Sequence, residues 1–416
     1  MMKALIASTV TASCILLMSH PVSAEDYLLR DGDTVVFLGD SITAARGYTK
    51  IIEHYSLMRF PDRRIRFYNA GKGGDTTQSS LQRLERDVFA RGATVMIVAL
   101  GVNDIGWGAR ADEVHKQKYL DGVKRLVEEC QQRRIRAVLC SPAITAEPSS
   151  KAETGFLQSM ADEGLALVRS LGAETVDVQR PMRDIQRKIE AHNSAVPDAA
   201  KHVHLHAADG IHLIDLGQVA MAFAILKGLG APDEVSSATL DARSGDVLAH
   251  SNCEISDVAR LDDGLTFTRL DGGLPLTRGP LSGLDYQWMP LPEQLNRYML
   301  LVKGLPEGSH EVIADGRLVQ RLSAAQLAEG VNLGIMTPDP WEPGGPWNVQ
   351  SDIVEELVDA RDKLLYGQSL TTLYGVEDRR ALQSNFAELD KQLTELQRRT
   401  AHPRKYKFEV KRITKP

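Results

Sequence analysis

Short β-rich runs alternate with amphipathic helical patterns from Thr34 to about Leu226, and this alternation constrains the fold more than any other feature of the sequence. It is typical of a parallel sheet whose two faces are covered by helices. The most apolar runs are continuously apolar, as expected for strands buried on both faces. The sequence therefore predicts an α/β fold. The predicted strands are Thr34 to Leu38, Arg64 to Tyr68, Thr94 to Leu100, Arg136 to Cys140 and Glu174 to Val178.

The composition changes at Gly228-Leu229-Gly230-Ala231-Pro232, where the last helical pattern ends, and we place a domain boundary at residue 232. Residues 233–345 are rich in Gly, Pro and Asp and carry short β-like runs, which predicts a β-rich accessory region. Within it, Arg297 to Leu305 and His310 to Gln320 are expected to be paired strands, with Asp315-Gly316 supplying a turn inside the second.

Residues 346–416 are predicted to form a helical tail, because apolar residues there recur at steps of four and three along one helix. We expect this seam to pack within the chain, although an oligomer formed through the C-terminal helix stays open. The seam consists of Leu382, Phe386, Leu389, Leu393 and Leu396.

The N-terminus predicts export. Met1-Met2-Lys3 precedes an apolar stretch from Ala4 to Met18, and Pro21-Val22-Ser23-Ala24 offers small residues for cleavage after Ala24. We interpret residues 1–24 as a signal peptide and expect a secreted or periplasmic protein. The alternative is an N-terminal membrane anchor, but the stretch is shorter than a stable membrane span requires. A lipid anchor at Cys14 is disfavoured, because the apolar run continues past that residue.

The net charge and the cysteine content indicate which partners the protein can bind and whether it contains disulfide bonds. The formal net charge of -6 supplies no excess of cations for phosphates, which argues against nucleic acid and favours a neutral or weakly polar substrate. After cleavage Cys130, Cys140 and Cys253 remain, enough for one intramolecular bridge at most. We expect buried free thiols.

Chemistry-bearing residues follow the first and third predicted strands. The first runs into Gly39-Asp40-Ser41-Ile42-Thr43, which places Ser41 at the sheet edge where open α/β folds bind ligands. Taken alone, Ser41 could equally be a helix N-cap. The third strand ends in Leu100-Gly101-Val102-Asn103-Asp104, where Asn103 could donate to an oxyanion or simply form an Asx turn.

Two further segments complete the set. The second strand is followed by a glycine-rich turn, Asn69 to Thr76, whose backbone N–H groups could approach an anion. A phosphate-binding loop is the competing interpretation, but neither the Walker pattern nor the dinucleotide fingerprint is matched. Before the last helix, the three-residue spacing of Asp209 and His212 lets a carboxylate bind the imidazole Nδ1 while Nε2 faces outward.

Together these four segments resemble, in order and at matching strand ends, the four blocks of the SGNH hydrolases, the GDSL-like esterases and lipases. The resemblance implies a flavodoxin-like sheet over residues 25–232, with Ser41 as nucleophile, His212 as base and Asp209 as orienter. It also implies an oxyanion hole built from Ser41, Gly74 and Asn103. Acyl transfer of this kind requires neither a metal nor an organic cofactor.

The expected reaction is carboxylic ester hydrolysis through an acyl-serine. Export, a mildly acidic chain and the absence of an obvious lipid-binding helix favour O-deacetylation of a carbohydrate. A lipolytic esterase or arylesterase acting on small acyl esters is the alternative within the same chemistry. A reading from another class makes the protein a glycan-binding or surface-assembly module with a vestigial hydrolase domain.

Three histidines and three tryptophans outside the four segments are further candidates for a role in the site. His202, His204 and His206 alternate and could in principle bind zinc, but we favour a polar loop beside the catalytic block. Trp107 directly follows the Asn103 segment and is a candidate substrate contact, with packing within the loop as an equal alternative. Trp341 and Trp347 lie among prolines and glycines, a composition common in loops that cover a site.

Overall fold

The first half of the chain forms a five-stranded parallel sheet in the order β2-β1-β3-β4-β5. The computed structural model describes residues 27–339, 341–374 and 379–413, so the predicted signal peptide lies outside the described residues. This strand order is that of flavodoxin-like folds. The predicted α/β sheet is therefore confirmed. Its strands are β1 (Thr34–Gly39), β2 (Arg66–Gly71), β3 (Val95–Ala99), β4 (Arg136–Cys140) and β5 (Glu174–Val176).

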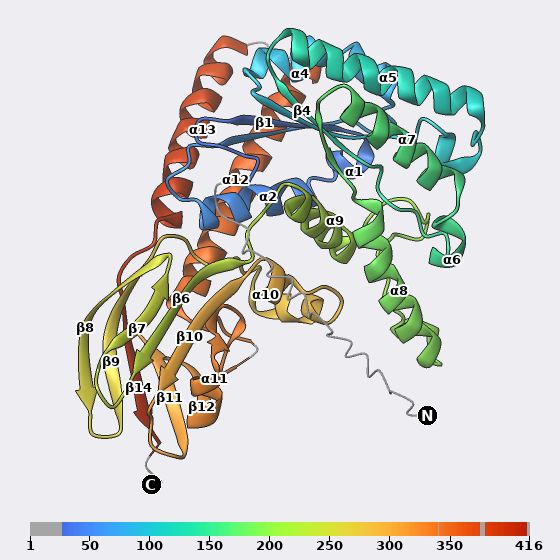
Figure 1. Cartoon of the computed structure of the whole chain (residues 1–416). Coiled ribbons are helices and arrows are strands. Elements are labelled where there is room, and N and C mark those ends of the chain that lie inside the picture. The colour runs from blue at the N-terminus through green and yellow to red at the C-terminus, as the bar shows by residue number, and fades with distance from the viewer. Residues whose placement is uncertain (1–26, 340, 375–378, 414–416) are drawn as a thin grey trace, which may run out of the picture.

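Helices cover both faces of this sheet, as Figure 1 shows, because alternate strand residues point to opposite sides. Val35 and Phe37 of β1 pack into a core with α2, α8 and α9, whereas Val36 and Leu38 pack into a second core with α4, α5 and α7. The helices of this half are α1 (Ser41–Ala44), α2 (Gly47–Arg59), α3 (Thr77–Leu81), α4 (Leu84–Asp87), α5 (Glu113–Gln132), α6 (Ser149–Ala152), α7 (Phe156–Ser170), α8 (Gln179–Ala195) and α9 (Asp215–Gly228).

The second half contains two sheets that share one core. The first has the order β13-β10-β6-β7 and the second the order β12-β11-β14-β9-β8. Their strands are β6 (Glu234–Asp241), β7 (Val247–Ser251), β8 (Cys253–Leu261), β9 (Gly264–Asp271), β10 (Arg297–Lys303), β11 (Ser309–Ala314), β12 (Arg317–Ser323), β13 (Val331–Asn332) and β14 (Tyr406–Arg412), and two short helices, α10 (Leu291–Gln294) and α11 (Ala324–Glu329), accompany them.

The strand pairing differs from the prediction at one point. The hairpin predicted around Asp315-Gly316 is present, because β11 pairs with β12 across that turn. The strand predicted at Arg297 to Leu305 does not pair with this hairpin; as β10 it pairs in parallel with β6 and in antiparallel with β13. A parallel partner that lies far away in the sequence leaves no turn signal from which the pairing could be predicted.

The predicted helical tail is a helix hairpin followed by a strand. α12 (Pro346–Tyr374) and α13 (Arg379–Ala401) pack against each other, and β14 then enters the second sheet between β9 and β11. Tyr406, Phe408 and Val410 alternate as buried residues of β14, so their period of two is the signal that sequence reasoning missed. In the predicted seam, Leu389 is 45% exposed and Leu382 lies outside the residues whose side chains are described.

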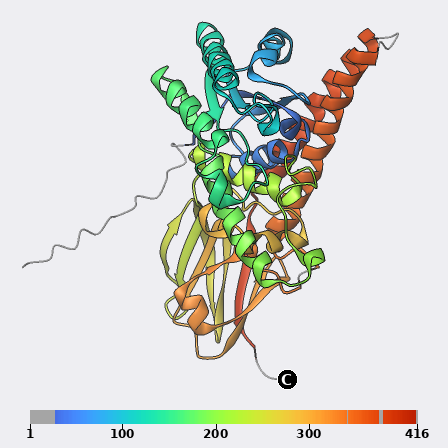
Figure 2. The same ribbon diagram turned by 90° about the vertical axis from the view of Figure 1, so that its right-hand side faces the viewer.

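The helix hairpin fastens the two halves of the chain together. Figure 1 and Figure 2 show α12 and α13 running from the β sheets along one side of the parallel sheet. Arg361 of α12 binds Glu53 Oε1 of α2 at 3.2 Å, the Phe67 carbonyl of β2 at 3.1 Å and Asp390 Oδ1 of α13 at 2.7 Å. Lys50 of α2 pairs with Asp359 of α12. The tail therefore packs on the first domain.

All three predicted free thiols, Cys130, Cys140 and Cys253, are free and buried, which confirms that expectation. Within the described ranges, no helix combines the length and the apolar character that crossing a bilayer requires.

We predict that Arg361→Met destabilises the fold by about 3 kcal/mol, because it leaves the buried Glu53 carboxylate without its ion-pair partner. The shift of the urea unfolding midpoint measures this. Arg64→Met is the matched control: Arg64 is 71% exposed and pairs with Asp31 in solvent, so its loss should shift the midpoint much less. Equal shifts in the two variants would contradict the assigned role of Arg361.

Candidate active site

The nucleophile segment turns sharply between β1 and α1. Asp40 caps α1, and its Oδ1 accepts a hydrogen bond from the Ile42 N–H at 2.9 Å. Ser41 is the first helical residue, so its own N–H has no acceptor within the helix. Gly39 is required at the turn, since a Cβ there would lie 1.9 Å from Thr43 Oγ1. The local sequence thus exposes the Ser41 hydroxyl and its N–H at the end of the strand.

A chain of hydrogen bonds joins Ser41 to the predicted base and orienter. His212 Nε2 lies 2.8 Å from Ser41 Oγ, and His212 Nδ1 lies 2.5 Å from Asp209 Oδ2. The structure therefore brings Ser41 into contact with a pair of residues that lies about 170 positions later in the sequence. In this arrangement the imidazole can take a proton from the hydroxyl while the carboxylate fixes the ring.

Asp209 is oriented by its own loop. Its Oδ1 accepts hydrogen bonds from the backbone N–H groups of Ile211 and His212, both at 2.9 Å. The hydrogen bond from His212 and these two backbone bonds hold the pKa of the Asp209 carboxyl well below its usual range. The carboxylate therefore stays charged to a lower pH than an ordinary aspartate does, and in its charged form it accepts the hydrogen bond from His212.

Gly74 and Asn103 also lie at this edge of the sheet. Gly74 has a left-handed backbone, with φ of +73°, just before the cap of α3. The Asn103 amide nitrogen lies 3.2 Å from the Asp75 carbonyl and 3.3 Å from Asp40 Oδ2. Both bonds are long, so one amide hydrogen can turn to another acceptor.

Arg83 is a contributor that sequence reasoning missed. Its guanidinium is buried and pairs with Asp75 at 2.6 Å. It also donates to the carbonyls of Ala70, at 2.7 Å, and Gly39, at 3.2 Å, and so ties the ends of β2 and β1 together. Nothing in the sequence around Arg83 singles it out, because its carbonyl acceptors lie at the ends of two strands whose pairing the local sequence does not reveal.

Trp107 contacts the site directly. Its indole Nε1–H donates to Asn103 Oδ1 at 2.9 Å, and its ring meets the His212 ring edge-on at a centroid distance of 5.8 Å. The prediction placed Trp107 near the substrate and did not foresee these two contacts. Trp347 is fully buried in the core of the β sheets. The prediction that it lies in a loop covering the site is therefore wrong. Trp341 is exposed.

Two of the three alternating histidines bind backbone carbonyls through their imidazole rings. His202 Nε2 lies 2.9 Å from the Val196 carbonyl, and His206 Nε2 lies 3.0 Å from that of Ile144. Among the described residues, His, Cys, Asp and Glu do not gather in any group of three that could bind a metal ion.

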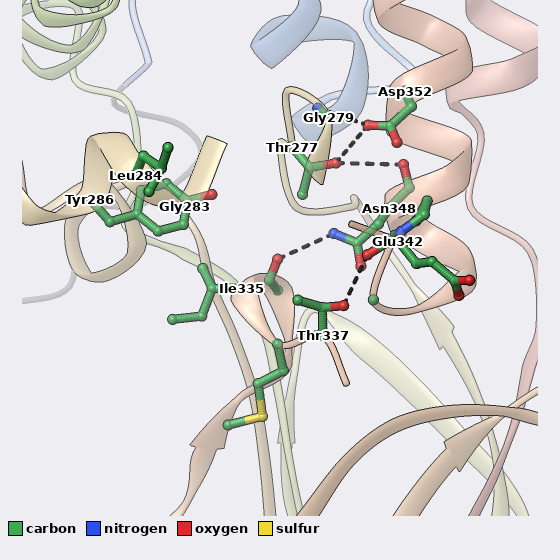
Figure 3. A pocket seen from close by; sticks show the side chains of 14 residues that line it. Thr277, Gly279, Gly283, Leu284, Tyr286, Ile335, Thr337, Glu342, Asn348 and Asp352 are labelled. Carbon is green, nitrogen blue, oxygen red and sulfur yellow. Dashed lines mark hydrogen bonds between the residues drawn. The ribbon is translucent and has the colours of Figure 1, made fainter. Parts of the chain in front are cut away.

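A pocket of about 220 Å³ lies in the second half of the chain, and Ser41, Asp209 and His212 are not among the residues that line it. Figure 3 shows Leu284 and Tyr286 on one side of this pocket and Asn348 and Asp352 of α12 on the other. The pocket therefore lies between the accessory region and the first turns of the helical tail.

Comparison with known proteins places this site in a family. Residues 37–220 match the model of the GDSL-like Lipase/Acylhydrolase family. This segment contains Ser41, Gly74, Asn103, Asp209 and His212, so the chain carries a GDSL-like acylhydrolase domain and the resemblance to SGNH hydrolases is confirmed. The family match identifies residues 37–220 as a domain of the acylhydrolase class.

Two solved structures are similar to this chain to different extents. A gut microbial diltiazem-metabolizing enzyme is similar over 93% of this chain and 100% of its own, with 20% identity and a TM-score of 0.80. Its likeness extends over both halves, so the two-part architecture is a shared fold. An acetylxylan esterase of Geobacillus stearothermophilus is 20% identical and covers 49% of this chain and 96% of its own, with a TM-score of 0.41.

A curated relative matches a shorter segment. The uncharacterized lipoprotein YqeF of Bacillus subtilis (strain 168) is 27% identical over 124 residues, 28% of this chain and 51% of the relative. The chain therefore spans about half the length of this relative. A lipoprotein among its relatives is compatible with export.

The Asp40 carboxyl generates a pH prediction. Burial raises its pKa to about 6, so the folded chain binds a proton there that the unfolded chain loses near pH 4. The proton contributes up to about 3 kcal/mol to the free energy of unfolding. This contribution is fully present below pH 4 and is lost as the pH rises through 6.

Asp40→Asn keeps a capping oxygen but cannot titrate. We expect its unfolding free energy to fall less than that of the parent between pH 4 and pH 6, measured by urea denaturation at several pH values. Parallel pH profiles of parent and variant would contradict the assignment.

Proposed function

We propose that the protein is an exported serine esterase that hydrolyses carboxylic esters through an acyl-serine, with O-acetyl groups on a carbohydrate as its substrate. The observation that carries this proposal is the continuous set of hydrogen bonds from Ser41 through His212 to Asp209. It lies at the carboxyl edge of the parallel sheet, where open α/β folds bind their ligands. Export would proceed through the predicted signal peptide, residues 1–24.

The mechanism follows from these contacts. His212 Nε2 takes the proton of Ser41 as Oγ attacks the ester carbonyl, and Asp209 stabilises the imidazolium. The proton then passes to the leaving alkoxide, which departs as the alcohol. Water attacks the acyl-serine with His212 again as base, releasing the acid and restoring the Ser41 hydroxyl.

Charge on the tetrahedral intermediate requires donors at the carbonyl oxygen. The N–H groups of Ser41 and Gly74 and the Asn103 amide are the proposed set, each worth about 3 kcal/mol in the transition state. The first-position N–H of α1 and the left-handed Gly74 both support this assignment. These donors are built into the chain, so no cofactor enters the mechanism.

A hollow beside the Asp209 loop favours a polar alcohol. This hollow has a volume of about 500 Å³, and Glu190, Asn193 and His204 line it. Such polar side chains suit a hydroxyl-rich alcohol.

Acyl release by the purified mature chain tests the proposal. We expect p-nitrophenyl acetate and an acetylated polysaccharide to be hydrolysed faster than the octanoate ester, with all turnover lost in Ser41→Ala, which removes only a hydroxyl. Two more substrates complete the series. One is p-nitrophenyl butyrate, and the other is diltiazem, which the gut microbial enzyme of the same fold metabolizes. Preference for octanoate would favour a lipolytic esterase. If Ser41→Ala matched the parent on every ester, the serine mechanism would be rejected.

Asn103→Ala should retain slow turnover, with kcat lowered by about a hundredfold or more, because one oxyanion donor is lost. Asn103→Asp is nearly isosteric but replaces the donor with a charged acceptor, so it should lose at least as much. Steady-state kinetics on p-nitrophenyl acetate measure both. Parental kcat in Asn103→Ala would remove Asn103 from the oxyanion hole.

A further inference from the structure

The backbone around Trp107 is unusual for so bulky a residue. Gly106, Trp107 and Gly108 all have left-handed φ values, of 52°, 58° and 94°. Glycine adopts this region freely, but a tryptophan is strained in it. The Trp107 N–H donates to the Val102 carbonyl at 3.0 Å, which fixes the strained turn against the end of the strand.

Burial does not account for this strain, because the Trp107 side chain is 52% exposed. Its specific contacts are with the active site: the indole N–H on Asn103 Oδ1 and the ring on His212. Strained residues persist where surrounding structure enforces them, and they cluster at functional sites. The strain and the two contacts together point to a role in the reaction.

The indole N–H determines which way the Asn103 amide faces. An indole N–H can only donate, so the atom beside it must be the amide oxygen. The Asp75 carbonyl can only accept, so the atom beside it must be the amide nitrogen. Without the indole donor, only two long hydrogen bonds, from the amide nitrogen to the Asp75 carbonyl and to Asp40 Oδ2, oppose rotation of the amide by half a turn. Its oxygen lone pairs would then face the oxyanion and repel it.

We propose that Trp107 is a positioning residue for ester hydrolysis, which fixes the Asn103 amide with its N–H donors toward the oxyanion and packs the His212 ring in place. This inference rests on the proposed function. It assigns to Trp107 an action through Asn103 that is distinct from contact with substrate. The indole N–H and the ring make separable contributions, because Phe retains a ring but carries no N–H.

A double-mutant cycle isolates the first contribution. We expect Trp107→Phe to lower kcat on p-nitrophenyl acetate by about tenfold, as for the loss of one orienting hydrogen bond, with little change in KM. In the Asn103→Ala background the same substitution should change kcat less than about twofold, because the group that it positions is gone. Trp341→Phe, at a tryptophan that is 73% exposed in the accessory region, is the matched control and should behave as the parent.

Two measurements exclude a merely structural role. Titration with a p-nitrophenyl phosphonate that labels Ser41 counts the folded active sites, so kcat is expressed per site. Trp107→Gly relieves the left-handed strain and should have a Tm no lower than that of the parent, while its kcat falls at least as far as that of Trp107→Phe.

Three results would overturn the inference: parental kcat in Trp107→Phe, an equal loss in both backgrounds, or a rise in KM alone. The last would make Trp107 a substrate contact. Failure of the proposed function is recognised separately, since the parent itself would then show no Ser41-dependent turnover and the inference would fall with it.

Discussion

The carboxyl ends of β2, β1 and β3 meet at one level, and the candidate site depends on this register. Gly39 at the end of β1 is opposite Gly71 of β2 and Ala99 of β3. The segments that follow these three residues carry Ser41, Gly74 and Asn103. Parallel pairing therefore brings the proposed nucleophile and two candidate donors to the same edge of the sheet. Only the His212 loop must be brought in from elsewhere, and α9 supports it.

The second half of the chain is attached next to this edge. α2 begins a few residues after Ser41, and its charged side chains Lys50 and Glu53 pair with α12. α12 also inserts Trp347 into the core between the β sheets. One helix thus contacts both halves of the chain. The accessory region is therefore attached directly to the hydrolase domain, which is consistent with a shared fold over 93% of the chain.

The sequence was sufficient for the parts of the fold that local patterns encode. Continuous apolar runs located the strands of the parallel sheet, and four short motifs located the residues that meet in the site. Contacts that depend on distant partners were not predictable in this way. β10 finds its parallel partner more than 50 residues away, and β14 joins β9 across more than 130 residues. Trp347 follows Pro346 and Gly345, which resembles a loop, yet it begins a helix and packs on Phe408.

In the site too, contacts between residues close in sequence could be predicted, whereas contacts that depend on the tertiary fold could not. Asp209 and His212 are three residues apart, so their hydrogen bond could be anticipated from spacing. Trp107 and Asn103 are four apart, yet their bond depends on a left-handed turn that the sequence suggests only through the two flanking glycines. Arg83 gave no signal, since its carbonyl acceptors are defined only once β1 and β2 are paired.

The buried carboxyls beneath Asn103 raise an electrostatic question for the proposed mechanism. Asp40, Asp75 and Asp104 are all buried near the place where the oxyanion would form, and full ionisation of the three would oppose that charge. The structure reduces this opposition in two ways. Arg83 pairs with Asp75, and burial raises the pKa of both Asp40 and Asp104. A carboxyl with a raised pKa loses its negative charge at a higher pH than an ordinary aspartate does, so the opposing charge in the folded site falls sooner as the pH is lowered.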